Sequence, residues 1–391
     1  MSAPRAGSAA RSAALRFVLT MGVVNLLADM TYEGGASLNG PFLASLGASA
    51  AAISIVAGLG EFLGYVLRPV AGVVADRLRR PWLLTFIGYV LNQLAVPALA
   101  LAAGLPAAMA LVLAERAGRA IRKPSVEAML SYTTGSLGKG WAYALNSALD
   151  ETGALLGPLL MALVLFRGGD ARAGYALLLL PAGLTLLSLT GARVAFPGPA
   201  RLEVGHTASA RGFSRRYWVY MLAASCFAAG LMSFEFISVH LQRGGLVAGA
   251  AIPALLALAT LCGIVASLVL GKLFDRHGMP VVVGAVLVSA AFSPLVFLGE
   301  LPAVVAGMLL WGVGYATQDT LFKAVIASVL PERRRSSAFG LFYAGYGLGW
   351  LLGSVVTGLL YEPSRGAVVA FSVTTQVLAA GIFFTAGRRR S

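Results

Sequence analysis

The sequence predicts an all-α integral membrane protein with twelve transmembrane helices in two pseudo-symmetric halves of six. Three observations support this fold class. Hydrophobic residues make up 58% of the chain and charged residues only 12%, whereas about 25% of an ordinary soluble domain is charged. Apolar runs of about 20 residues, enough to cross a bilayer, recur along the whole chain. The two halves also resemble each other in sequence. These features exclude a soluble enzyme, a nucleic-acid-binding domain and a disordered protein.

Each long apolar run is expected to be helical, because lipid offers no partner for free backbone groups. The apolar run that begins at Phe17 is followed by no clear cleavage site, so we expect a retained first helix. The polar stretch 196–215 is predicted to be a cytoplasmic linker between an N-terminal half, 1–195, and a C-terminal half, 216–391. The predicted spans are 17–38, 48–75, 82–103, 106–128, 140–166, 173–193, 216–241, 247–272, 280–299, 302–327, 336–361 and 365–387.

The distribution of basic residues predicts the orientation of these spans. Lys and Arg number 30 against 16 Asp and Glu, a net charge of +14. With twelve spans, 25 of the 30 cations fall on one side of the membrane and four on the other. Because cationic loops stay on the cytoplasmic side, we expect both termini in the cytoplasm and a location in a bacterial inner membrane. The excess charge then reflects topology, and no nucleic-acid partner is expected.

The two halves share an internal repeat. The segment 72–81, GVVADRLRRP, recurs as GKLFDRHGMP at 271–280, an offset of 199. Residues 118–130 match 314–326 at an offset of 196, and GALLG at 153–157 matches GWLLG at 349–353. The two Asp-Arg loops carry most weight, because each follows an even-numbered span at the same place in its half.

Twelve spans, a central loop and G-x-x-x-D-R after spans two and eight resemble the major facilitator superfamily over essentially the whole chain. The family pattern, G-x-x-x-D-R-x-G-R/K-R/K, is modified here by Arg79, and the second copy lacks the basic pair. The resemblance implies alternating access and a monomer. An aspartate at a helix end can meet the positive N-terminus of a neighbouring helix, which would latch one conformation. The predicted latch residues are Gly72, Asp76, Arg77, Gly271, Asp275 and Arg276.

Span five carries GALLGP, which is similar to the G-x-x-x-G-P motif of the family's proton antiporters. Gly153 and Gly157 are four residues apart, so both lie on one helix face and permit close helix packing. Pro158 is expected to add a kink. The similarity favours a drug/proton-antiporter type of transporter.

Charged residues inside membrane spans are costly and mark function or pairing. Here they fall in spans one, two, four, five, seven and ten, and the resemblance implies that one, four, seven and ten line the central cavity. A buried carboxyl without a basic neighbour within one turn can exchange a proton near neutral pH. The proton-coupling candidates are Asp29, Glu33, Glu61 and Asp150. The substrate-cavity candidates are Tyr32, Glu115, Arg119, Glu235, Gln318, Asp319 and Lys323.

Some of these charges have a structural alternative. Glu115 with Arg119, and Asp319 with Lys323, have the i,i+4 spacing of pairs that neutralise each other. Arg119 is also suited to hold an anionic group. Arg122, together with Arg116 and Lys123, is expected to lie at the cytoplasmic boundary and to extend its charged group into water.

The sequence contains no phosphate-binding loop, no hydrolase triad and no metal-ligand spacing. We therefore expect no enzymatic activity, no cofactor and no bound metal. The preferred function is secondary active transport by alternating access, with proton-coupled export of a small organic molecule. Two alternatives remain open. One is uptake or facilitated transport of a small solute, such as an anion held by Arg119, and the other is a membrane sensor that transports nothing.

Overall fold

The computed structural model of the chain describes residues 8–48, 50–203, 213–234, 236–237, 240–241, 252–330, 334–361 and 363–388. Every regular element within these residues is a helix, which confirms the all-α prediction. The elements of the first half are α1 (Ser8–Ser45), α2 (Ala50–Leu78), α3 (Pro81–Ala98), η1 (Leu99–Leu101), α4 (Leu105–Ser131), α5 (Thr134–Leu137), α6 (Lys139–Phe166), α7 (Ala171–Leu177), α8 (Leu179–Ala195) and η2 (Pro199–Leu202). Those of the second half are α9 (Arg215–Gly230), α11 (Ile252–His277), α12 (Met279–Ala290), α13 (Phe292–Leu298), α14 (Leu301–Ala316), η4 (Thr317–Phe322), α15 (Lys323–Ala327), α16 (Arg335–Tyr361) and α17 (Arg365–Arg388).

Nine helical segments of the described residues are long and apolar enough to cross a membrane. With 29 and 27 residues, α2 and α4 also have the length to do so, and α4 carries a run of charged residues that lowers its hydropathy. The predicted span 216–241 is interrupted, because α9 ends at Gly230 and the backbone is non-helical over 231–233 before helix resumes at Phe234. The predicted span 17–38 lies within α1, which starts at Ser8.

Spatial contacts divide the chain into two compact units. The N-unit contains Met1–Leu137, Leu149–Ala208 and Glu332–Tyr343, and the C-unit contains Gly138–Ala148, Ser209–Pro331 and Ala344–Ser391. The first residues of α16 thus belong to the N-unit, and the first residues of α6 belong to the C-unit. The division of the sequence into halves at 196–215 stays a prediction about how the chain is organised.

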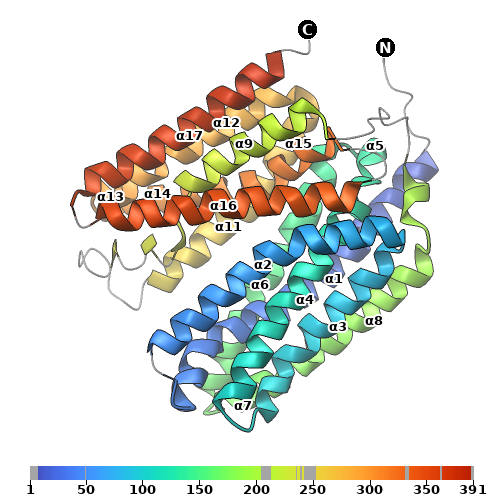
Figure 1. The fold of residues 1–391 in the computed structure, drawn as a ribbon, viewed down its shortest axis with the longest axis vertical. Helices are drawn as coiled ribbons and strands as arrows, with labels where there is room; N and C mark the ends of the chain where they lie inside the picture. Colours follow the sequence, from blue (N-terminus) through green and yellow to red (C-terminus); the bar gives the residue numbers. More distant parts are fainter. Residues whose placement is uncertain are drawn as a thin grey trace. The chain divides into compact units, whose positions relative to one another are not determined.

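Within the N-unit, α3 packs against α4 and α8, α2 packs against α4, and α1 packs against α8 (Figure 1). An apolar cluster that includes Leu38, Phe42, Val96, Leu178 and Tyr175 fills the space between α1, α3 and α7. Within the C-unit, α17 packs against α9 and α12, and α14 packs against α11 and α12 (Figure 1).

Glycines allow two helix pairs to approach closely, and the two pairs repeat each other. A Cβ at Gly153 or Gly157 of α6 would collide with the carbonyl oxygen of Leu26 or Met30 in α1. At an offset of 196, a Cβ at Gly349 or Gly353 of α16 would collide with backbone atoms of α9. The repeat seen in the sequence is therefore a repeat of helix packing, since only glycine permits backbones to come this close.

Candidate functional site

The N-unit buries a cluster of charged and polar side chains where α4 meets α1, α3 and α6. We call this set the N-unit cluster. Most of its acids come from α1 and α6 and all of its cations come from α4. Its members are Asn25, Asp29, Tyr32, Glu33, Tyr89, Asn92, Gln93, Glu115, Arg116, Arg119, Arg122, Lys123, Glu127 and Asp150.

Arg122 joins α4 to α1 and α3 in the middle of this cluster. Its side chain is 1% exposed, and its Nη2 lies 3.4 Å from Oδ1 of Asp29. Its Nη1 donates to Oδ1 of Asn25 at 3.3 Å, and its guanidinium lies over the Tyr89 ring at 4.3 Å. The Tyr89 hydroxyl donates to the same Asn25 oxygen. The expectation that Arg122 reaches water at the membrane boundary is therefore wrong, because an acid on another helix holds it inside.

Tyr32 is the meeting point of two further arginines. Arg119 and Arg116 both donate to its hydroxyl, the second at 3.4 Å, and the Arg119 guanidinium lies 3.9 Å from the ring centroid. The Tyr32 side chain also hydrogen-bonds to Glu33. The sequence placed Tyr32, Glu33 and Arg119 among the candidates, and the structure brings them together. A hydroxyl held between two cations is a local positive site.

Glu115 does not make the predicted pair with Arg119. Its Oε2 lies 3.4 Å from Nε of the adjacent Arg116, and its Oε1 accepts from Nδ2 of Asn92 on α3 at 2.7 Å. Gln93 donates to Asn92 at 2.6 Å and to the Ala28 carbonyl at 3.3 Å. The sequence reading missed Asn92, Gln93, Asn25 and Tyr89 because it searched the spans for charge. A search for uncharged polar residues within the apolar runs would have identified these four residues.

Asp150 of α6 has a partner on α4 as well. Its Oδ2 lies 3.4 Å from Nζ of Lys123, and Lys123 also lies 3.9 Å from Oε1 of Glu127, one turn along α4. The Tyr343 hydroxyl donates to the same Glu127 oxygen at 3.0 Å. Neither Asp29 nor Asp150 has a basic residue within one turn of its own helix, and α4 supplies one to each.

The span-five motif holds Asp150 at this place. Gly153 and Gly157 lie one and two turns beyond Asp150 in α6, on the face that packs against α1. Pro158 follows within the helix, which continues to Phe166. Because both glycines fix the approach of α6 to α1, they also fix the position of Asp150 beside α4.

Among the described residues, the predicted substrate-cavity residues of the C-unit pair with each other or with a tyrosine. Nζ of Lys323 lies 3.1 Å from Oδ1 of Asp319, the i,i+4 pair that the spacing predicts. Gln318 accepts a hydrogen bond from the Tyr346 hydroxyl. These residues lie in or next to η4, a π-helical segment at Thr317–Phe322, and wide turns of this kind are frequent at functional sites.

The interrupted seventh span borders a small cavity of about 320 Å³ in the C-unit. Leu231, Met232, Ser233 and Phe236 line one side of it, and residues of α16 line the other. The Met232 carbonyl accepts from Nε1 of Trp311 at 2.8 Å, so the free backbone group at the break has a partner. Broken helices of this kind are a common site of substrate contact in transporters.

Both Asp-Arg loops cap the N-terminus of another helix. In the N-unit, Asp76 accepts from the backbone nitrogens of Ser336 and Ser337 at 3.2 and 2.7 Å, at the start of α16. In the C-unit, Asp275 accepts from the nitrogens of Gly140 and Trp141, both at 2.8 Å, at the start of α6. Each carboxylate thus satisfies two backbone donors that have no partner within their own helix.

Glycines let these loops approach the helices that they cap. A Cβ at Gly72 would collide with the backbone of Ser336, and a Cβ at Gly271 would collide with Gly140. The predicted Arg77 and Arg276 lie next to the two aspartates, in the last turns of α2 and α11. Two of the predicted residues fall outside the description, namely the side chain of Glu61 in α2 and the whole of Glu235.

Comparisons with known proteins agree with this architecture. The family model described as the Major Facilitator Superfamily matches residues 21–353 and 247–390. An uncharacterized protein of Mycobacterium tuberculosis is 35% identical over 379 residues, which cover 95% of this chain and 93% of that protein.

Two solved structures share the fold. A bacterial homologue of the iron transporter ferroportin, in an outward-facing state, has a TM-score of 0.74 at 14% identity and covers 95% of this chain and 100% of its own. The proton:xylose symporter bound to 6-bromo-6-deoxy-D-glucose has a TM-score of 0.70 at 16% identity and covers 96% of both chains. These matches confirm the predicted fold of twelve transmembrane helices in two six-helix halves. The chain belongs to the Major Facilitator Superfamily of membrane transporters.

Proposed function

We propose that this transporter couples the export of a small organic molecule to proton entry, by alternating access. One observation carries the proposal: two acids inside the membrane spans, Asp29 and Asp150, each face a cation on α4 at 3.4 Å. Buried ion pairs add little to stability compared with well-packed apolar residues. Charges retained in membrane helices at such cost mark ion or proton pathways.

The pairs give a direct route from protonation to helix movement. A proton on Asp29 removes its negative charge and so weakens its hold on Arg122, and Asp150 stands in the same relation to Lys123. Glu33 and Glu61 are the further proton-coupling candidates, with Glu33 next to the Tyr32 site. We place substrate contact at Tyr32, Arg119 and Glu115 in the N-unit and at Glu235, Gln318, Asp319 and Lys323 in the C-unit.

The two helix caps serve as conformational latches in this proposal. Asp76 and Asp275 each hold two backbone nitrogens at the start of a spanning helix. Breaking a cap costs about 1 kcal/mol, an amount that substrate binding energy easily exceeds. Release of each cap frees the first turn of α16 or α6 to move. Gly72 and Gly271 allow the approach, and Arg77 and Arg276 complete the motif.

The surroundings of the protein follow from the charge distribution. Leaving out the four cations of the N-unit cluster and the buried Lys323, 20 cations fall on one side of the twelve predicted spans and four on the other, so both termini lie in the cytoplasm and the protein resides in a bacterial inner membrane. The protein works as a monomer, its coupling ion is the proton, and the lipid bilayer is its solvent.

Proton movement in everted membrane vesicles tests the coupling. A respiratory pH gradient is established and a panel of drugs, metabolites and ions is added. We expect one compound to collapse the gradient only in vesicles that contain the transporter. Asp29→Asn and Asp150→Asn should abolish the response. Glu33→Gln and Glu61→Gln test the two further proton-coupling candidates. Glu300→Gln is the control, because Glu300 is an exposed acid outside the cluster. Unchanged responses in all four variants would rule out this coupling.

A second candidate function is uptake or facilitated transport of a small anion. The observation that favours it is the pair of arginines, Arg119 and Arg116, on the Tyr32 hydroxyl. Labelled-solute flux in proteoliposomes separates the two functions. Anion flux that needs no proton gradient and is lost in Arg119→Gln supports uptake, whereas flux that stops when the gradient is removed supports proton coupling.

A further inference from the structure

A large cavity lies in the N-unit, apart from the N-unit cluster. Its volume is about 1040 Å³. It lies where four spanning helices have an end, at the last residues of α2, α4 and α8 and the first of α3, beside the start of α16. The ends of spanning helices are at the level of lipid headgroups, because the apolar core of the bilayer stops there.

The walls of this cavity are positively charged. Four arginines line it, Arg79, Arg80, Arg193 and Arg335, against one acid, Asp76. Both oxygens of Asp76 already accept backbone hydrogen bonds from α16, and Arg335 has its own partner in Glu203. Among the described residues, Arg79, Arg80 and Arg193 form no ion pair and their side chains are exposed, so their charges are accessible to a ligand.

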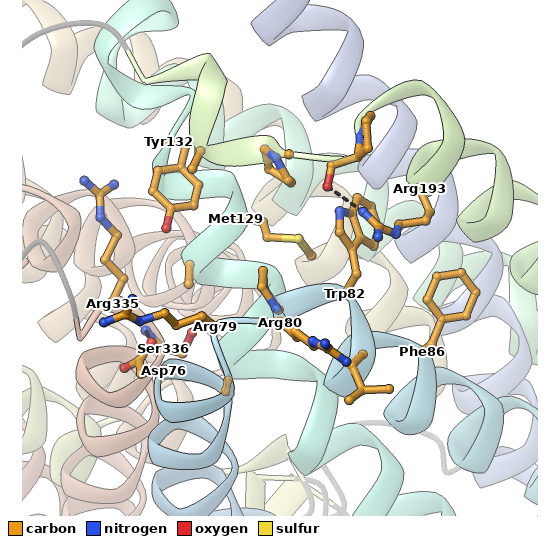
Figure 2. A pocket seen from close by; sticks show the side chains of 18 residues that line it. Asp76, Arg79, Arg80, Trp82, Phe86, Met129, Tyr132, Arg193, Arg335 and Ser336 are labelled. Atoms are coloured by element: carbon orange, nitrogen blue, oxygen red, sulfur yellow. Dashed lines mark hydrogen bonds between the residues drawn. The ribbon is translucent and has the colours of Figure 1, made fainter.

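The arginines lie on two sides of the cavity (Figure 2). Arg79 and Arg335 lie on the side of Asp76 and Ser336, whereas Arg80 and Arg193 lie on the side of Trp82 and Phe86. Arg193 donates to the Pro197 carbonyl at 2.5 Å, and its guanidinium lies 5.9 Å from the centroid of the Trp82 ring. Nε1 of Trp82 donates to the Phe196 carbonyl at 3.1 Å. The second side of the cavity is therefore lined by aromatic rings, with the Trp82 ring held in place, and carries two arginines.

The backbone at Arg79 is strained, whereas the equivalent position of the repeated loop is a glycine. Arg79 has φ 51°, and among the described residues no other non-glycine has a positive φ. At an offset of 199, Gly278 occupies the same place in the second loop with φ 68°. Both loops thus have a positive φ at this position, which glycine adopts without strain. A strained residue that persists where glycine would fit is an indication of function.

The outer face of α3 extends this cavity along the membrane. Leu83 lines the cavity, and Leu83, Ile87, Val90 and Leu94 are 43%, 46%, 41% and 44% exposed. Their spacing of four, three and four residues places them on one helix face. From Leu83 to Leu94 the helix rises about 16 Å at 1.5 Å per residue, close to the thickness of one leaflet, which is about 15 Å.

We propose that this cavity binds the phosphate group of an anionic phospholipid. Arg79, Arg80 and Arg193 neutralise the headgroup, and one acyl chain lies along the exposed face of α3. A guanidinium donates two parallel hydrogen bonds to phosphate oxygens, which suits arginine to this task. Basic pockets between spanning helices recognise lipid headgroups in this way. The apolar face that begins at the cavity favours a lipid over a free phosphate ion.

Lipid titration of the purified, delipidated full chain in neutral detergent tests the proposal. Phosphatidylglycerol, phosphatidylcholine, glycerol 1-phosphate and inorganic phosphate are added separately, and bound molecules are counted by native mass spectrometry. We expect saturable retention of phosphatidylglycerol alone. Arg80→Gln and Arg193→Gln should each lower its apparent affinity about tenfold, the effect of losing one charge-assisted hydrogen bond.

Two further variants separate binding from folding and from general charge. Arg79→Gly places in the first loop the residue that the second loop already has, so the variant should fold at least as well as the unmodified protein. It should nevertheless bind the lipid less tightly, because one cation of the cavity is lost. Arg16→Gln removes one exposed cation that does not line the cavity, and it should change the affinity less than twofold. Equal losses in Arg16→Gln and the cavity variants would overturn the proposal. Retention of glycerol 1-phosphate as tight as that of phosphatidylglycerol would overturn the lipid as the source.

Discussion

In the N-unit, α4 carries four cations, two of which pair with acids on neighbouring helices, whereas the matching segment of the C-unit, from α14 to α15, carries aromatic rings at two of the charged positions of α4. The offset of 196 pairs Glu115 with Trp311, Arg119 with Tyr315, Arg122 with Gln318, and Lys123 with Asp319. The rings of Trp311 and Tyr315 lie 4.3 Å apart, and the Tyr315 ring lies 6.3 Å from that of Trp350. At the positions of Glu115 and Arg119, an aromatic side chain of the C-unit therefore takes the place of a charged one.

This difference shows that the fold does not require the charges of α4. Both helices pack alike, α4 against α2 and α3 and α14 against α11 and α12. One ion pair recurs with its order reversed: Lys123 and Glu127 in α4 match Asp319 and Lys323, with N–O distances of 3.9 and 3.1 Å. Because aromatic rings pack well at the matching positions of the C-unit, helix packing does not explain the remaining acids and cations of the N-unit. We therefore attribute a chemical role to these charges. Four predictions test the comparison.

The largest effect is expected at Arg122 and its counterpart Gln318. Arg122→Met leaves the Asp29 carboxylate buried without its cation and should cost about 3–5 kcal/mol of unfolding free energy. Gln318→Met removes one hydrogen bond from Tyr346 and should cost about 1 kcal/mol. Denaturant and thermal unfolding of both variants in detergent measure the difference. The double variant Asp29→Asn with Arg122→Met should recover part of the loss, and equal losses at the two positions would contradict the asymmetry.

The close glycine contacts should instead behave alike in the two units. Gly157→Ala places a methyl group against α1, and Gly353→Ala places one against α9. Each should cost about 1–3 kcal/mol of unfolding free energy through overpacking. Gly183→Ala in α8 and Gly381→Ala in α17 are matched controls, because no atom lies within 4 Å of a Cβ at either position. They should change stability by less than about 0.5 kcal/mol. A tolerated alanine at Gly157 alone would show that the repeat does not extend to packing.

Much of this architecture was predictable, because membrane-spanning helices and an internal repeat produce recognisable patterns in the sequence. These patterns predict the spans, the two Asp-Arg loops and the packing glycines. The partners of Asp29 and Asp150 do not, since helical spacing tells which residues share a face and not which helix faces them. Arg122 was for this reason assigned to the membrane boundary, although it lies inside.

The identity of the two capped helices and the break in the seventh span were hidden from the sequence for different reasons. A carboxylate that caps another helix leaves no pattern at the start of that helix, where Ser336 and Gly140 look ordinary. The interruption at 231–233 contains no proline, and its carbonyl partner, Trp311, lies 79 residues away. Both features depend on contacts between distant segments, which one sequence does not encode locally.

The two helix caps should lose similar amounts of stability. Asp76→Ala and Asp275→Ala each remove both acceptors for two backbone donors and should cost about 1 kcal/mol of unfolding free energy. Asp76→Asn and Asp275→Asn keep an acceptor oxygen and should retain about half of that stability, since the charge also interacts with the helix dipole. Thermal unfolding in detergent measures all four variants. A loss confined to one loop would break the symmetry between the caps.

The smallest effect is expected where the loops themselves differ, at Arg79 and Gly278. Both residues adopt a positive φ, 51° and 68°, and an L-residue in the left-handed region is less stable than glycine by about 1 kcal/mol. Arg79→Gly should therefore stabilise the protein by about that amount. Thermal unfolding in lipid-free detergent measures this difference without the contribution of a bound headgroup. When phosphatidylglycerol is added, the unmodified protein should recover the lost stability and Arg79→Gly should gain less. If Arg79→Gly were less stable even without lipid, then the arginine would stabilise the loop through contacts of its own, and the strain at this position would not indicate a ligand.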